Sequence, residues 1–172
     1  MVTLPQIEQQ AASYGLILRL KVKHYINLWT FSVIVARPRE GQSAILLGQL
    51  KGWAYNTNQG LHLDTLRIQG EYINGVGSLL WGATFAWALT HTPCSSAHLL
   101  AISDEIKQHK KLVRYFKRIG FQGKRVLKGN LIDLPLRLIW GGSGLIMKGD
   151  CKVGLIHCNH WLFNKNSVSI SM

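Results

Sequence analysis

The residues best suited to chemistry lie in the middle of the chain, where a strand-like segment gives way to a helical one. The short sequence Gly75-Val76-Gly77-Ser78 comes just before an apolar helical segment. A helix N-terminus offers backbone N–H groups without partners and the positive end of the helix dipole, which together suit a phosphate. Most glycine pairs before helices serve turns or packing. The glycine pair therefore predicts a phosphate site only when it is taken together with the sequence motifs on either side of it.

Four side chains near this region are candidates for a general base: His62, Asp64, Glu71 and His109. A base must lie within about 3 Å of the proton it removes, or reach it through one water. His62 and Asp64 share the strand-like segment 61–68, so we favour these two. A solvent-facing or capping role is the competing interpretation for each.

A basic segment follows between Lys107 and Lys128, and it contains no acidic residue. It holds nine of the 20 Lys and Arg residues: Lys107, Lys110, Lys111, Arg114, Lys117, Arg118, Lys124, Arg125 and Lys128. The ordinary interpretation is a solvated helix face. The alternative is a surface for anions, which include a phosphorylated cofactor, nucleic acid, an acidic protein or an acidic membrane.

The C-terminal part places Cys151, His157, Cys158 and His160 within ten residues. Zinc ligands normally occur in pairs separated by two to four residues, and this spacing lacks such pairs. We therefore expect no metal. The odd number of cysteines, with no CxxC pair, favours a reducing compartment. With no visible signal peptide and no apolar run long enough to span a bilayer, we expect a cytoplasmic protein.

The composition excludes an intrinsically disordered chain. The chain has 172 residues, a net charge of +12, 47% hydrophobic residues and only 16% charged residues. An intrinsically disordered chain needs low hydrophobicity together with high net charge. The length fits one domain of about 150 residues.

Hydrophobic periodicity indicates both helices and strands. We expect helices over residues 5–13, 78–91 and 103–119, and strands over residues 16–24, 27–36, 43–55, 61–68, 97–102, 121–127, 134–140 and 145–148. The segment 61–68 changes phase, because Leu61 and Leu63 share one parity whereas Leu66 and Ile68 share the other. A β-bulge near Asp64 and Thr65 would keep all four on one face.

From about Leu61 to Trp140 the chain resembles the GNAT superfamily of acyl-CoA-dependent N-acetyltransferases. The family loop R/Q-x-x-G-x-G/A corresponds to Tyr72-Ile73-Asn74-Gly75-Val76-Gly77. The helix that ends in Tyr-x-x-x-Gly-Phe corresponds to the segment that ends in Phe116-Lys117-Arg118-Ile119-Gly120-Phe121.

The resemblance implies an α/β fold with a mixed (α+β) sheet. The N-terminal strands would be antiparallel, the strands 61–68 and 97–102 would be parallel and splayed, and helices would cover both faces. A single domain would span residues 1–148, with 149–172 as a C-terminal extension. Acetyl-CoA or CoA would bind with its pyrophosphate on the amides of Gly75, Val76, Gly77 and Ser78. Its pantetheine arm would lie along Leu66, Arg67 and Ile68, and Lys110 and Lys111 would assist.

The chain also departs from the family pattern. Phe116 stands at the position of the usual tyrosine acid, and Tyr115 lies one residue earlier, about 100° round a helix. Tyr72 replaces the Arg or Gln of the loop, and the helices that normally follow the first strand are missing. Two hypotheses result. One is an N-acetyltransferase that acts on an unidentified amine, with Tyr115, Asp64 and His62 as catalytic candidates. The other is a catalytically silent module that engages a partner through its basic face.

Overall fold

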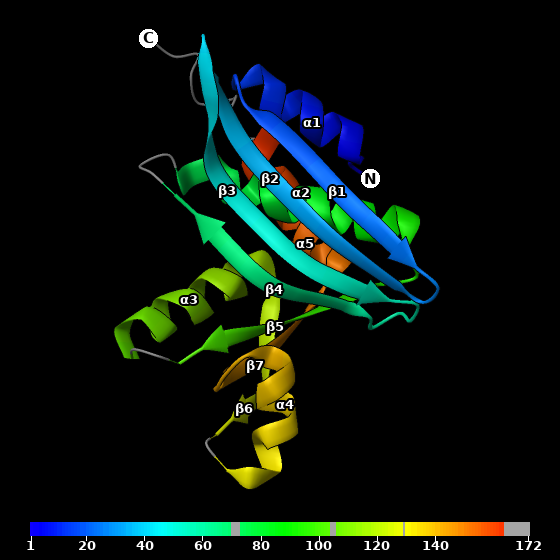
Figure 1. The fold of residues 1–172 in the computed structure, drawn as a ribbon, viewed down its shortest axis with the longest axis vertical. Coiled ribbons are helices and arrows are strands. Elements are labelled where there is room, and N and C mark those ends of the chain that lie inside the picture. The colour runs from blue at the N-terminus through cyan, green and yellow to red at the C-terminus, as the bar shows by residue number, and fades with distance from the viewer. Residues whose placement is uncertain (70–72, 104–105, 129, 164–172) are drawn as a thin grey trace.

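The computed structural model describes residues 1–69, 73–103, 106–128 and 130–163. Along the chain the elements are α1 (Leu4–Ser13), β1 (Ile17–Tyr25), β2 (Leu28–Arg39), β3 (Gln42–Tyr55), β4 (Leu61–Ile68), α2 (Ile73–His91), β5 (Ser96–Ile102), α3 (Ile106–Ile119), β6 (Phe121–Leu127), the 3-10 helix η1 (Leu131–Asp133), α4 (Leu134–Trp140), β7 (Gly144–Asp150) and α5 (Cys151–Phe163) (Figure 1).

The strands form one seven-stranded sheet in the order β1-β2-β3-β4-β5-β7-β6. The first four strands pair antiparallel, β4 and β5 pair parallel, and β7 is inserted antiparallel between β5 and β6. The connection from β4 to the parallel β5 requires a crossover, which α2 provides. The expected α/β class and mixed sheet are therefore confirmed.

The main core lies between the sheet and α2, which is apolar nearly all round and almost completely buried. Helices α1 and α5 pack against α2; in Figure 1, α2 and α5 lie behind the long strands and α1 lies beside β1. Helix α4 lies on the opposite face, where the Trp140 ring packs at a tilt against Trp53 and His62. Helices thus lie on both faces of the sheet, as expected.

The phase change in β4 is a β-bulge. Lys51 of β3 pairs with Thr65, and the next residue, Gly52, pairs with Leu63. Asp64 is the extra residue, and its insertion keeps Leu61, Leu63, Leu66 and Ile68 on the face of the sheet that α2 covers.

Two local expectations were wrong. Residues 134–140 form α4 rather than a strand, because Pro135 lies in the first helical turn, where its missing N–H costs nothing. Gly141 then ends this helix in the left-handed conformation, with φ of 75°. Helix α2 begins at Ile73, earlier than the expected start at residue 78.

Residues 151–163 of the expected C-terminal extension form helix α5. The boundary expected after residue 148 falls inside β7, and α5 follows β7 directly. Helix α5 packs closely on α2: a Cβ at Gly154 would lie only 2.5 Å from the Phe85 ring. Residues 149–163 therefore belong to the same core as the sheet. None of the helices within the described ranges combines the length and apolarity needed to cross a bilayer.

Candidate functional site

The main site is a cleft between β4 and β5. These strands pair only through Leu61↔Ala97, His62↔His98 and Leu63↔Leu99, and beyond these pairs the ladder stops. A cavity of about 290 Å³ opens there, close to the lower end of the range for ligand pockets. It is lined by Leu50, Leu63, Asp64, Thr65, Leu66, Arg67, Trp81, Leu99, Leu100, Ile102, Leu112 and Phe116.

The β4 side of this cleft is an open strand edge. Between Thr65 and Ile68, β4 pairs with β3 on one side, whereas within the described part of the chain no strand pairs with its other side. Backbone N–H and C=O groups on such an edge seek partners. The cleft therefore joins an apolar lining to a row of backbone groups able to pair with an extended ligand.

Asp64 brings a carboxylate to the cleft. As the bulged residue of β4, Asp64 lines the cleft and is exposed. The hydroxyl of Thr65 donates a hydrogen bond to its Oδ2 over 2.8 Å. Asp64 is thus the predicted base that the structure places beside the cleft.

His62 lies elsewhere, on the other face of the sheet. Its ring stacks on Trp53 at 5.6 Å and on His98 at 5.5 Å, with Trp140 at 5.2 Å. Burial and the neighbouring His98 lower the pKa of His62 to about 4, so its imidazole is neutral near pH 7. His62 and Asp64 do not form one catalytic group, because the bulge lies between them.

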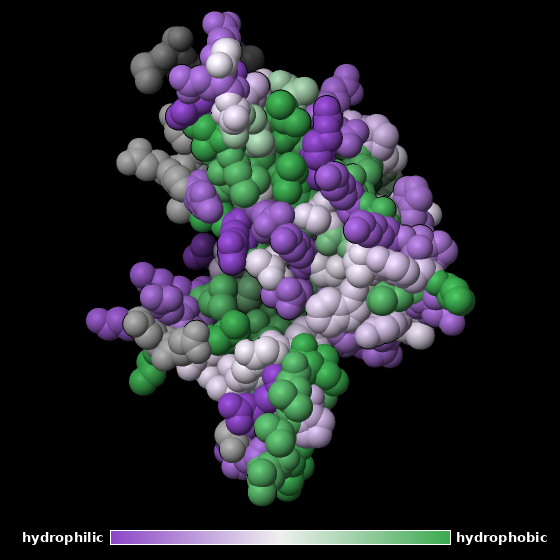
Figure 2. Space-filling model, viewed as in Figure 1, coloured by the Kyte–Doolittle hydropathy of each residue, from purple (hydrophilic) through white to green (hydrophobic). Residues whose placement is uncertain are grey.

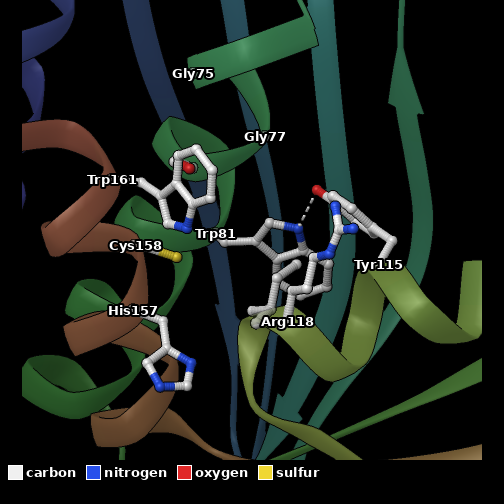
Figure 3. A pocket seen from close by; sticks show the side chains of 10 residues that line it. Gly75, Gly77, Trp81, Tyr115, Arg118, His157, Cys158 and Trp161 are labelled. Carbon is white, nitrogen blue, oxygen red and sulfur yellow. Dashed lines mark hydrogen bonds between the residues drawn. The ribbon is translucent and has the colours of Figure 1, made fainter. Parts of the chain in front are cut away.

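A second cavity, of about 200 Å³, lies between α2, α3 and α5. Figure 3 shows Trp161, Cys158 and His157 on one wall, with Arg118 and Tyr115 facing them. Gly75, Gly77 and Ser78 of α2 also line it, so the predicted phosphate segment does border a cavity. Buried Trp81 lines both this pocket and the cleft.

Only part of the predicted phosphate segment lies in the first turn of α2. An α-helix leaves only its first N–H groups without intrahelical partners. Because α2 begins at Ile73, the amide of Gly75 belongs to this first turn, whereas those of Gly77 and Ser78 lie beyond it. Gly77 instead provides space, since a Cβ there would lie 2.6 Å from the Tyr115 hydroxyl oxygen. The side chain of Val76 is buried in the core.

Tyr115 lies in the second pocket and not at the cleft. Its hydroxyl oxygen accepts a hydrogen bond of 2.9 Å from the indole nitrogen of Trp81. Burial raises the pKa of Tyr115 to about 12, so the phenol stays protonated at neutral pH. The neighbouring Phe116 is the α3 aromatic residue that lines the cleft.

The remaining predicted residues are dispersed. Lys110 and Lys111 are exposed on α3 and line neither cavity. His109 contacts the carbonyl oxygen of Ile102 through Nδ1, at 3.0 Å. Glu71 and Tyr72 lie outside the described residues.

Sequence reasoning missed three residues of the second pocket, namely Arg118, His157 and Trp161. The sequence does not distinguish Arg118 from the other basic residues of α3. His157 was considered only as a metal ligand. On α5, however, Cys151 and Cys158 face the core while His157 is exposed, and no group of three potential metal ligands occurs within the described ranges. Burial raises the pKa of the Cys158 thiol to about 12, which keeps it protonated.

The comparisons with known proteins identify no family for this chain. No protein-family model matches the chain, and no curated protein sequence matches it. Among solved structures, the chain is similar to an uncharacterized protein from Bacillus halodurans, with 17% identity and a TM-score of 0.46. The similarity covers 78% of this chain and 66% of that protein, just under two thirds of its length. At this level the similarity identifies neither a family nor an activity.

Proposed function

We propose that the chain binds an acyl-CoA in the cleft between β4 and β5 and transfers its acetyl group to an amine. The observation that carries this proposal is the open edge of β4 from Thr65 to Ile68, which faces a cavity instead of a neighbouring strand. The amides of a pantetheine arm would pair with this edge, and the apolar lining would hold the methylene groups. The motif resemblance described above supports the same ligand.

The phosphates would lie where β4 leads into α2. Ile68 and Gly77 are neighbours there, since a Cβ on Gly77 would lie 3.4 Å from Ile68 Cδ1. The N–H groups in the first turn of α2 have no partners within the helix, and Arg118 adds a positive charge to the adjacent pocket. The net charge of +12 favours an anionic ligand as well.

The chemistry is a direct transfer. The amine nitrogen attacks the thioester carbonyl, the C–S bond breaks, and the thiolate leaves as CoA. Asp64, at the bulge beside the cleft, would take the proton released by the amine, directly or through one water. A thiol has a pKa of about 8.5, so the thiolate can depart without an acid, but more slowly.

A second candidate function is a silent acyl-CoA-binding module. Two observations favour it: Phe116 lines the cleft at the position where the family pattern has a proton donor, and the Tyr115 hydroxyl lies in the other pocket. Such a module would hold the ligand without cleaving its thioester.

A calorimetric titration with acetyl-CoA tests ligand binding. Leu100→Trp would fill the cleft and is expected to abolish binding, whereas Leu100→Ala, which leaves it open, is expected to bind. Ser78→Asp would place a negative charge in the second pocket, next to the proposed phosphate position, and is expected to weaken binding at least tenfold. Ser78→Asn is its matched uncharged control. Binding that is unchanged in both Leu100→Trp and Ser78→Asp would refute the proposed site.

Release of free thiol from acetyl-CoA, measured with a panel of amines, then separates the two functions. Cleavage that depends on the amine and falls at least tenfold in Asp64→Asn supports the transferase. Firm binding with no cleavage for any amine supports the silent module.

A further inference from the structure

A group of exposed apolar side chains lies on η1 and α4. Leu131, Ile132 and Leu138 are 86%, 83% and 77% exposed, and Leu134 and Ile139 are also exposed. Together these five side chains form what we call the apolar tip. Figure 2 shows it as a continuous green ridge at the end of the molecule where Figure 1 labels α4, far from β1 and α1. A contiguous exposed patch of this kind marks an interaction site.

Other side chains of η1 and α4 attach the apolar tip to the rest of the protein. Asp133 of η1 is buried and accepts hydrogen bonds from the Arg125 guanidinium and the Lys128 backbone N–H. These interactions lower the pKa of Asp133, and the hydrogen bond from the Lys128 amide contributes most. Trp140 at the other end of α4 packs on Trp53 and His62. The fold therefore fixes the segment at both ends while its leucines and isoleucines face outward.

The surroundings of the tip are basic. Residues 121–140 contain Lys124, Arg125, Lys128 and Arg137, against Asp133 as the single acid. Asp133 is buried and ion-paired with Arg125, so it does not offset the exposed charges of Lys124 and Lys128. The tip thus combines protruding aliphatic side chains with a positively charged border.

We infer that the apolar tip docks the protein on an anionic lipid bilayer. Aliphatic side chains enter the boundary between headgroups and acyl chains, while nearby Lys and Arg contact anionic headgroups.

The charge argues against a second copy on this surface, because a symmetric contact would bring two basic borders together. A single-stranded nucleic acid would need stacking aromatic side chains, which the five residues of the tip do not provide, and the phosphates of a duplex offer protruding leucines and isoleucines no partner. An acidic protein would need a pocket shaped for a protruding ridge, whereas a fluid bilayer deforms around it. This inference is independent of the proposed function.

Sedimentation with vesicles tests the inference. The wild-type chain is expected to bind vesicles that contain phosphatidylserine at least tenfold more tightly than vesicles of phosphatidylcholine alone. Leu131→Ser with Leu138→Ser should lose roughly tenfold or more of this binding. Lys124→Gln with Lys128→Gln should lose about fivefold per lysine, and added salt should weaken wild-type binding. The matched controls, Ile26→Ser at the exposed β1–β2 turn and Lys21→Gln with Lys23→Gln on β1, should bind as wild type does.

Several results would overturn the inference. The first is equal binding by the wild type and the Leu131→Ser, Leu138→Ser variant, once circular dichroism shows that the variant is folded. The second is a dimer in light scattering that this variant abolishes, which would assign the tip to a second copy. The third is tip-dependent binding of an acidic polypeptide at least as tight as that of vesicles, which would assign it to a protein partner.

Discussion

The hydroxyl oxygen of Tyr115 on α3 accepts a hydrogen bond from the indole nitrogen of Trp81 on α2, over 2.9 Å. The same oxygen occupies the space that a side chain at position 77 would need. Tyr115 therefore links α3 to the beginning of α2, on the side of Trp81 away from the cleft. Its environment is that of a structural residue, and this can be tested.

Tyr115→Phe should destabilise the protein with little effect on thioester cleavage. The variant leaves the indole N–H of buried Trp81 without its partner, which costs about 1–3 kcal/mol of unfolding free energy. Urea denaturation measures this loss, and Tyr25→Phe at an exposed position is the control. A fall in cleavage rate of more than about tenfold, with acetyl-CoA affinity unchanged, would instead identify Tyr115 as the acid.

Gly77→Ala should be destabilising in the wild type and much less so in Tyr115→Phe. The new Cβ would lie 2.6 Å from the phenol oxygen, and overpacking of this kind costs about 1–3 kcal/mol. Without that oxygen, the nearest atoms are Ile68 Cδ1 at 3.4 Å and the ring carbon Cζ at 3.7 Å, which are ordinary contacts.

A double-mutant cycle in urea should therefore show coupling of about 1 kcal/mol or more between positions 77 and 115. Gly142→Ala, which faces open space, is the control and should show no coupling to Tyr115→Phe. Additive effects at positions 77 and 115 would mean that the phenol does not constrain residue 77.

The sequence was most informative where a local pattern had one physical solution. The parity change between Leu63 and Leu66 required a bulge, and Asp64 is the bulged residue. By contrast, the alternation of leucines at 134, 136 and 138 fits a strand as well as a short helix. Pro135 and Gly141, which favour a helix, were the signals to weigh more heavily.

The site was harder to predict because distant segments build it. Arg118 and His157 share a pocket only because α5 packs against α2 and α3. The spacing of Cys151, Leu155, Cys158 and Leu162 has helical periodicity and was the available signal for α5. That Tyr115 and Phe116 would face different cavities depends on the rotation of α3, which the motif alone does not define.

Phe116→Tyr should accelerate acetyl transfer if departure of the thiolate limits the rate. Phe116 lines the cleft, so a phenol there would stand close to the predicted thioester. General acid catalysis contributes about 10²–10⁴-fold when well placed, and we expect at least a tenfold gain in thiol release at saturating acetyl-CoA. Phe163→Tyr, at a more exposed position, is the control. An unchanged rate in a folded, ligand-binding variant would favour the silent module.

Acid should destabilise the protein through His62. Burial, and then His98, lower the pKa of His62 from 6.5 to about 4. Between these values the unfolded chain binds more protons than the folded chain, so the unfolding free energy falls as the pH drops from 6.5 towards 4. Below pH 4 both states are protonated at this site, and its contribution no longer changes. Because His62 is only partly buried, we expect a loss on the order of 1 kcal/mol.

His62→Gln isolates this contribution. The variant removes the titrating ring, so its unfolding free energy in urea should fall less between pH 6.5 and 4 than that of the wild type. His98 also has a lowered pKa, caused first by burial. The His62→Gln variant should therefore keep part of the slope of unfolding free energy against pH. The double variant His62→Gln with His98→Gln should lose more of this slope. The matched control is His24→Gln, because His24 also stacks on a tryptophan but is exposed on β1. This control should keep the slope of the wild type. An equal loss of slope in His24→Gln and His62→Gln would mean that the aromatic cluster around His62 does not hold its imidazole neutral.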